Sequence, residues 1–181
     1  NNHWLSLFET DRTCILDPIE RPLPFTPFKD FTGKAINEIN LYSTEMAAAL
    51  CALDNAKISA NMSNRLSEAI VDAYKKTQGA PITFKLMLSN YQGKLQNPEK
   101  DDSVSSILKQ LVRNKLFENE DKTNLIKECF IVKMDAFPKD GPIAKAIVYF
   151  LISKLNLIYE QLDKQAVSDD YVQIRHFTII D

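Results

Sequence analysis

A long stretch of helix-forming sequence, set between two short runs of strand-forming residues, constrains this fold most. Residues 35–117 carry apolar side chains at three- and four-residue spacings, the period of an α-helix. The apolar run at residues 14–16 precedes the stretch, and residues 129–134 (CFIVKM) follow it. Both runs are rich in residues that favour strands. The order predicts a helical unit inserted between two strands of one sheet.

Prolines, glycines and charged turns divide the helical stretch into about four helices. The pattern begins near residue 35, and Ser43-Thr44-Glu45 are residues that favour a helix N-terminus. Three further helices are expected at residues 60–76, at 83–91 and from residue 103 onward. The first helix is expected to bury Leu41, Met46, Ala49, Leu50 and Leu53. The third carries a stripe broad enough to indicate burial on most sides: Phe84, Leu86, Met87, Leu88 and Tyr91.

The segments on either side of the helical stretch complete the expected sheet. Residues 21–28 (RPLPFTPF) hold three prolines and predict an extended loop, pinned to the core by Leu23, Phe25 and Phe28. Pro142 suits the first position of a long helix that runs to about residue 165, and a last strand is expected at 171–181. This strand–helix–strand order fits a right-handed crossover between parallel strands.

These elements predict a helix-rich α/β fold, with a short parallel sheet and an all-α insertion of about four helices. Continuous apolar runs, as opposed to alternating ones, favour strands that are buried on both faces. The expected division is residues 1–33 for the first strand and the proline-rich loop, 34–124 for the helical insertion, and 125–181 for the strand–helix–strand unit.

The charge balance gives no general attraction to nucleic acid or to anionic lipid. The 181 residues include 22 Lys and Arg against 24 Asp and Glu, a formal net charge of -2. Basic residues gather on helix faces, and a solvated face is favoured over nucleic-acid contact there. These clusters are Lys75 with Lys76, and Lys109 with Arg113 and Lys115.

Cysteine, histidine and hydropathy patterns indicate a reduced, cytoplasmic protein without a membrane segment. The 3 cysteines are far apart, and neither of the 2 histidines has a metal-ligand spacing. The longest apolar stretch, residues 143–162, is interrupted by Lys145, Lys154 and Glu160. We therefore expect no membrane span.

Asp181 is the one candidate catalytic residue, because it follows an apolar run directly. Nucleotide-hydrolysing α/β proteins hold magnesium with a carboxylate at the carboxyl end of a buried strand. Thr178 makes this run less apolar, and a charged residue also follows an apolar run by chance in many proteins. A structural role for Asp181 therefore stays open. Asp17 also follows an apolar run, but Pro18 comes next, and a turn role is favoured there.

A phosphate-binding loop cannot be built from this sequence. The 4 glycines are spaced so that none completes a GxxxxGK[ST] motif. The chain alone is therefore expected to bind no triphosphate. Asn1 is not an initiator methionine, and Asp181 stands directly after a strand, so we expect these residues to be an internal part of a longer protein.

The layout resembles HerA/FtsK-type P-loop ATPases. RHFTIID, which ends at Asp181, looks like the start of their Walker B segment, and LDPIERPLPFTPF is similar to the proline-rich loop after an earlier strand. ECFIVKMDAFP and PIAKAIVYFLISKLNLIYEQL match the strand and the long helix that precede Walker B. The greatest similarity is to the ATPases of DNA phosphorothioation-dependent restriction, and conjugative-transfer ATPases share the layout.

This resemblance implies part of a RecA-like core, lying between Walker A and Walker B. The parent protein would be a cytoplasmic, ATP-dependent DNA translocase or helicase-type motor of a bacterial defence system. It would use ATP and Mg²⁺, with Asp181 holding the metal through water, and its partners would be DNA, other restriction subunits and further copies in a ring. Walker A, a glutamate after Asp181 and an arginine finger are missing here, so the chain is expected to be inactive alone and to hold no cofactor.

Two other functions stay open. A non-enzymatic α-helical interaction module would form a self-contained bundle with an apolar surface groove. A small-molecule-binding α/β protein would need a pocket between the helices and the proline-rich loop. The motor hypothesis predicts that residues 129–134 and 177–180 are parallel neighbours, with Asp181 at the carboxyl edge of the sheet.

Overall fold

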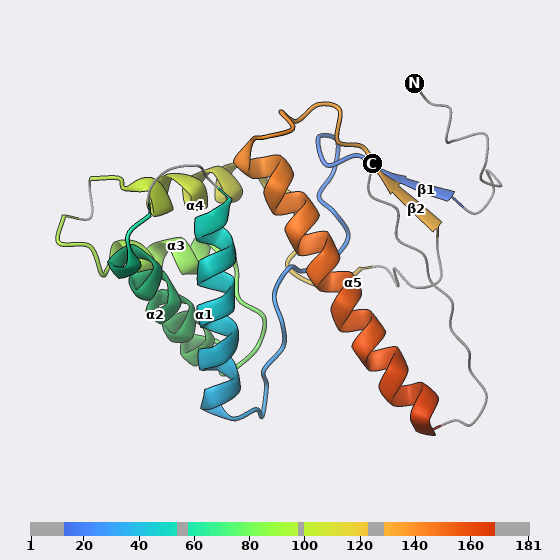
Figure 1. Cartoon of the computed structure of the whole chain (residues 1–181), viewed down its shortest axis with the longest axis horizontal. Helices are drawn as coiled ribbons and strands as arrows, with labels where there is room; N and C mark the ends of the chain where they lie inside the picture. The colour runs from blue at the N-terminus through green and yellow to red at the C-terminus, as the bar shows by residue number, and fades with distance from the viewer. Residues whose placement is uncertain (1–12, 54–57, 98–99, 123–128, 169–181) are drawn as a thin grey trace.

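The computed structural model describes residues 13–53, 58–97, 100–122 and 129–168, which form a helix-rich α/β structure with a two-stranded parallel sheet (Figure 1). Four helices lie between the two strands in the sequence, as predicted, and a long helix follows the second strand. The elements are β1 (Thr13–Leu16), α1 (Ile36–Ala52), α2 (Ala60–Lys76), α3 (Phe84–Gln92), α4 (Ser103–Asn114), β2 (Cys129–Val132) and α5 (Pro142–Ser168).

The sheet pairs β1 with β2 in parallel, from Thr13 opposite Cys129 to Leu16 opposite Val132. Parallel strands need a long crossover connection, which the proline-rich loop and helices α1–α4 supply here. Strand β2 is shorter than the predicted 129–134, because a turn begins at Met134, whose carbonyl accepts the N–H of Phe137 at 3.0 Å. The predicted third strand, residues 171–181, lies outside the described residues.

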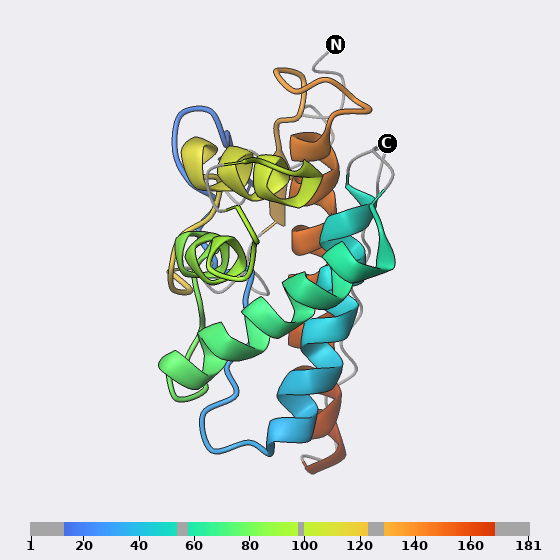
Figure 2. The ribbon, with the colours of Figure 1, turned by 90° about the vertical axis from the view of Figure 1, so that its left-hand side faces the viewer.

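Helices α1–α4 form one unit beside α5, and the two strands lie on the other side of α5 (Figure 1). Within the unit each helix packs on the next one in the sequence, and α4 also contacts α5. The view from the side shows α1 and α2 crossing in front of α5 (Figure 2). The long helix therefore lies between the helical unit and the sheet.

Helix α1 differs from its prediction on its buried face. It begins at Ile36 after the extended residue Ala35, close to the predicted start of the helical pattern, so Ser43-Thr44-Glu45 do not form its N-terminus. Ser43 lies inside the helix and is fully buried, whereas Leu41, expected in the core, is 65% exposed. The sequence favours an apolar stripe through Leu41 because leucine is apolar and serine is not, but the packing of α1 on α2 and α4 turns the face that holds Ser43 inward. The buried face is Ile39, Ser43, Met46, Ala47 and Leu50.

The other helices follow the local signals in the sequence. Ser59, Thr83 and Asp102 each cap a helix by accepting a backbone N–H with the side chain, as hydroxyl and carboxylate residues do at N-termini. Helix α2 has its predicted bounds, and Pro142 is the first residue of α5, as expected. In α3, Met87, Asn90 and Tyr91 are buried, and the other residues of the predicted stripe are half-buried against the core, so the helix is buried on most sides as predicted.

The proline-rich loop is held at both ends by backbone hydrogen bonds. At one end the N–H of Leu23 donates to the carbonyl of Leu116 at 2.7 Å, and Leu23 in turn accepts the N–H of Glu118 at 3.0 Å. At the other end the N–H of Phe31 donates to the carbonyl of Gly79 at 2.7 Å. The loop thus connects the end of α4 to the end of α2.

One hydrophobic core joins the loop, the helical unit and α5. Leu23, Phe25 and Phe28 of the loop are buried in it, as predicted, together with Phe150 of α5. Buried residues of α1–α4 belong to the same cluster. The predicted division at residues 33 and 124 stays a prediction, but no separate core marks it within the described residues.

Candidate functional site

The carboxyl edge of the sheet brings two charged residues together. Asp17 directly follows β1, and Lys133 directly follows β2. Because the strands are parallel and in register, these residues are neighbours, and Lys133 Nζ lies 3.3 Å from Asp17 Oδ2. Ligands of open α/β sheets bind at this edge, so it is the first place to look for a site.

The carboxylate of Asp17 stabilises a turn by accepting a backbone hydrogen bond within it. Its Oδ1 accepts the N–H of Ile19 at 3.0 Å, and its carbonyl accepts the N–H groups of Glu20 and Arg21, both at 3.1 Å. The bond from Ile19 and then the ammonium of Lys133 hold the pKa of Asp17 below its ordinary value. The turn role that the sequence favours for Asp17 is confirmed.

Asp181 lies outside the described residues, so its metal-binding role stays a prediction. In the part of the chain that the structure describes, no group of three or more His, Cys, Asp or Glu residues is placed to hold a metal ion. The described residues therefore offer Asp17 and Lys133 as the charged groups of the sheet edge, and neither makes a metal site.

A surface cavity of about 470 Å³ lies between α1 and α2. On one side of the cavity, Lys94 Nζ forms ion pairs with Asp72 Oδ2 at 2.7 Å and with Glu68 Oε2 at 3.5 Å. The hydrogen bond to Asp72 raises the pKa of Lys94. Apart from Val71, the lining residues are polar or charged, whereas an interaction module is expected to have an apolar groove. The lining residues are Asn40, Thr44, Ser67, Glu68, Val71, Asp72, Lys75 and Lys94.

Asp121 joins three segments that are distant in the sequence. Its Oδ1 accepts the N–H of Thr26 in the proline-rich loop at 3.0 Å, and its Oδ2 accepts a hydrogen bond from Lys154 Nζ of α5. The Lys154 side chain is only 14% exposed. This contact is not among the predictions from the sequence, although Lys154, a lysine inside an apolar helix, signals a buried cation in need of a partner.

Five phenylalanine rings meet at the same junction. Phe25 lies 5.6 Å from Phe117, and Phe28 lies 4.8 Å from Phe84, measured between ring centroids. Phe150 of α5 is 5.5 Å from Phe84 and 5.3 Å from Phe117. Edge-to-face rings at these separations attract each other beyond the area they bury. The loop, α3, the end of α4 and α5 are therefore packed into one body.

Helix α5 combines the length of a membrane span with the contacts of a core helix. Residues Pro142–Glu160 have a mean hydropathy of 1.3, which suits a span by length and composition, and 28% of that stretch is buried. Phe150 is fully buried among the rings, and Lys154 bonds to Asp121. The expected absence of a membrane partner stays a prediction.

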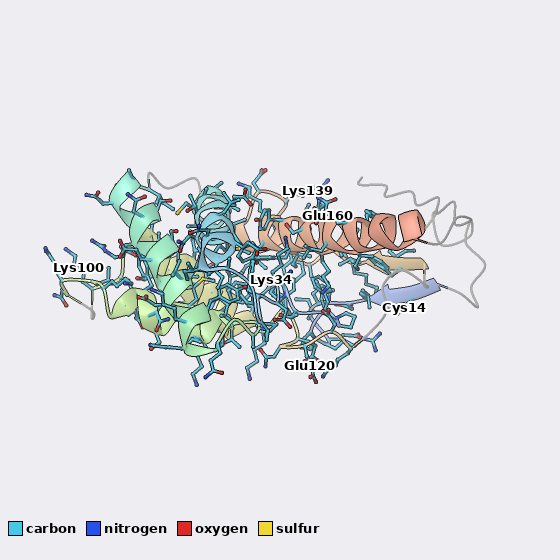
Figure 3. All side chains as sticks on the ribbon, turned by 90° about the horizontal axis from the view of Figure 1, so that it is seen from below. Cys14, Lys34, Lys100, Glu120, Lys139 and Glu160 are labelled. Atoms are coloured by element: carbon cyan, nitrogen blue, oxygen red, sulfur yellow. The ribbon has the colours of Figure 1, made fainter. Side chains whose placement is uncertain are left out.

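The basic clusters named above lie at the surface of the helical unit. Lys109 Nζ pairs with Asp101 Oδ1 at 2.6 Å, and Lys76 Nζ donates to Asn90 Oδ1. Figure 3 shows the turn before α4, labelled at Lys100, at the opposite end of the molecule from β1, labelled at Cys14.

No family model matches this chain, and no curated protein and no solved structure matches it. The resemblance to HerA/FtsK-type ATPases therefore rests on the layout of its elements and on the residues quoted for it.

Proposed function

We propose that this chain is part of the RecA-like core of a HerA/FtsK-type P-loop ATPase, lying between its Walker A and Walker B motifs. The whole protein would be an ATP-dependent DNA motor of a phosphorothioation-dependent restriction system, most like DptH, which is also called DndH. In this proposal ATP and Mg²⁺ bind the whole protein, and DNA, other restriction subunits and further copies of the motor are its partners.

The observation that supports the proposal is the parallel pairing of β1 with β2 across a connection that contains the proline-rich loop and helices α1–α4. In the proposed family the strand before the proline-rich loop and the strand before the long helix belong to one parallel sheet. An antiparallel pairing of these two segments would have contradicted that layout. The long helix α5 then leads toward the segment that ends in Asp181.

The proposed role of Asp181 is to hold Mg²⁺ through water, and the metal would neutralise the charge that develops as the γ-phosphate leaves. No GxxxxGK[ST] phosphate-binding loop can be built from the residues of this chain. We therefore expect the chain alone, purified, to hydrolyse ATP no faster than a buffer control. A rate above that control which disappears in Asp181→Ala would overturn this part of the proposal.

The decisive experiment uses the longer protein that carries this sequence, assayed for ATP hydrolysis with and without duplex DNA. Replacing Asp181 by Asn is expected to lower the DNA-stimulated rate by about 100-fold or more, because the carboxylate that holds the metal is lost. Asp17→Asn is the matched control, since that carboxylate serves a turn at the same sheet edge. Equal rates in wild type and Asp181→Asn would refute the metal role.

A further inference from the structure

Four lysines that are distant in the sequence meet at one end of the helical unit. Lys75 and Lys76 lie in the last turn of α2, whereas Lys29 and Lys34 lie in the loop that leads to α1. Two views of the ribbon place the end of α2 beside this loop, at the lower end of the helical unit (Figures 1 and 2). We call these four residues the basic end.

Hydrogen bonds hold the loop against the end of α2. The Tyr74 hydroxyl donates to the carbonyl of Lys29 at 3.0 Å. The N–H of Phe31 donates to the carbonyl of Gly79 at 2.7 Å, and the carbonyl of Phe31 in turn accepts the N–H of Lys34 at 2.9 Å. The fold itself therefore brings the two pairs of lysines together.

The lysines of the basic end form no ion pair with any described residue. Lys34, Lys75 and Lys76 are exposed. Lys76 Nζ donates to Oδ1 of Asn90, which is neutral, so the charge of that ammonium is not compensated. Lysines elsewhere on the molecule do pair with carboxylates, as Lys94, Lys109, Lys122, Lys133 and Lys154 show.

The carboxylates near the basic end do not cancel its charge. Asp30 lies in the loop between the two lysines, and Glu38 lies in the first turn of α1. Glu68 and Asp72, further back along α2, pair with Lys94. The four lysines therefore leave an excess of positive charge at this end. Such an excess attracts a polyanion locally, although the whole chain has a formal net charge of -2.

We propose that the basic end is a docking surface for the phosphate backbone of duplex DNA. Lysine ammonium groups bind phosphates as point charges and do not read the base sequence. The choice of DNA among polyanions rests on the proposed function, whereas the surface rests on the contacts and charges given above. The sequence favours a solvated face for Lys75 and Lys76, because it does not show that the loop lysines join them.

An anionic membrane fits this surface less well than DNA does. Helices that lie on a membrane present one continuous apolar face beside their basic residues. Helix α1, which begins next to the basic end, exposes Ile36 and Leu41. Their separation in the sequence places them about 140° apart around the helix axis, so they do not share a face.

DNA binding without nucleotide tests the docking surface. Fluorescence anisotropy with a labelled duplex of random sequence compares the full-length protein that carries this sequence with its triple variant Lys34→Gln, Lys75→Gln and Lys76→Gln. We expect the dissociation constant to rise about 10-fold or more at physiological salt. The slope of log affinity against log salt concentration should become shallower by about 0.9 for each phosphate contact that is lost.

Two further variants control for charge and folding. Lys100→Gln with Arg113→Gln and Lys115→Gln removes the same charge from exposed residues near α4 and is expected to bind DNA as the wild type does. Figure 3 shows Lys100 well apart from Lys34. Replacing the three lysines of the test variant by Arg keeps their charge, so affinity and slope should be retained. Circular dichroism checks that each variant is folded.

The outcomes separate the possibilities. Equal losses of affinity in the two Gln variants would attribute binding to general charge, and unchanged affinity in the test variant would place DNA elsewhere. Binding to vesicles that contain phosphatidylserine, lost in the test variant while DNA binding persists, would make a membrane the partner. Each of these results, or no duplex binding by the wild type, overturns the proposal. None of these readouts involves ATP hydrolysis, so the docking surface and the ATPase function can fail independently.

Discussion

Single residues set the close approach between the proline-rich loop and the helical unit. Gly79 follows α2 with a φ of +91°, and an added Cβ would lie 2.6 Å from the carbonyl oxygen of Phe31. Its own carbonyl accepts the N–H of Phe31 at 2.7 Å. Gly33 shares the positive φ, at +73°, but an added Cβ there meets nothing within 4 Å. Substitutions at the two glycines therefore distinguish the energetic cost of the backbone conformation, which both share, from the cost of a steric clash, which only Gly79 would cause.

Gly79→Ala is expected to destabilise the protein by more than the strain of the backbone conformation, which is about 1–3 kcal/mol. The additional loss comes from pushing Phe31 away from the end of α2. Gly33→Ala, the matched control, is expected to cost only about 1 kcal/mol. Urea denaturation followed by circular dichroism measures both, and equal losses would show that the contact with Phe31 contributes nothing.

Between elements, Asp121 ties α5 to the proline-rich loop through two hydrogen bonds. Removing the carboxylate leaves the Lys154 ammonium, only 14% exposed, without that partner. Asp101 makes a comparable ion pair with Lys109, but both of those side chains are 40% exposed or more. Water replaces a lost partner easily in the second pair and poorly in the first.

We expect Asp121→Ala to lower the free energy of unfolding by about 1–3 kcal/mol. Asp101→Ala is expected to lower it by less than about 1 kcal/mol, because exposed ion pairs contribute little. Chemical denaturation of both variants at low salt gives the comparison. Replacing Lys154 by Met in the Asp121→Ala background should recover part of the loss, and no recovery would argue against a buried unpaired charge.

Buried tyrosines make the helical unit sensitive to alkali. Burial raises the pKa of Tyr74 and of Tyr91 above the ordinary value of 10.0, and the carboxylate of Asp102, which accepts the Tyr91 hydroxyl at 2.6 Å, raises that of Tyr91 further. The unfolded chain loses these protons near its ordinary pKa while the folded chain keeps them. The stability is therefore fully present below pH 10 and falls as the pH rises above it.

Each such tyrosine is expected to make the unfolding free energy fall by about 1.4 kcal/mol per pH unit above pH 10. Tyr91→Phe removes one of these contributions, so its stability should fall less steeply with pH than that of the wild type. Denaturation curves between pH 8 and pH 11 measure the slopes. Parallel slopes in the two proteins would contradict the prediction.

For the whole molecule, the shared core means that α5 and the helical unit stabilise each other. Phe150 is the ring of α5 at the centre of this core, 5.3 Å from Phe117 and 5.5 Å from Phe84. Leu41 on α1 is apolar but 65% exposed. A mutation at Phe150 should therefore destabilise both α5 and the helical unit, whereas a mutation at Leu41 should destabilise neither.

Phe150→Ala is expected to cost about 3–5 kcal/mol, the usual loss for a buried phenylalanine. Because one core spans the junction, the unfolding transition should move as a whole to lower denaturant concentration and should not split into two transitions. Hydrogen exchange should show faster amide exchange in α1–α4 as well as in α5. Leu41→Ala is expected to change stability by less than about 0.5 kcal/mol. Faster exchange confined to α5 would show that the two parts fold separately.

The sequence by itself determined the helix positions that depend on capping residues, proline and apolar periodicity, because these signals are local. Thr83 and Asp102 mark the starts of α3 and α4, and Pro142 marks the start of α5. The apolar period located α2 within its observed bounds. Capping and periodicity act within one or two helical turns, so they can be read from neighbouring residues without any knowledge of the fold.

Only the tertiary structure decided which distant residues meet. The register of β1 on β2, the inward turn of Ser43 in place of Leu41, and the bonds of Asp121 to Thr26 and Lys154 all depend on segments far apart in the sequence. Their physical cause is packing between elements, which fixes rotation about a helix axis and selects partners for buried polar groups. No local pattern encodes those choices, because each depends on the shape of the neighbour that covers it.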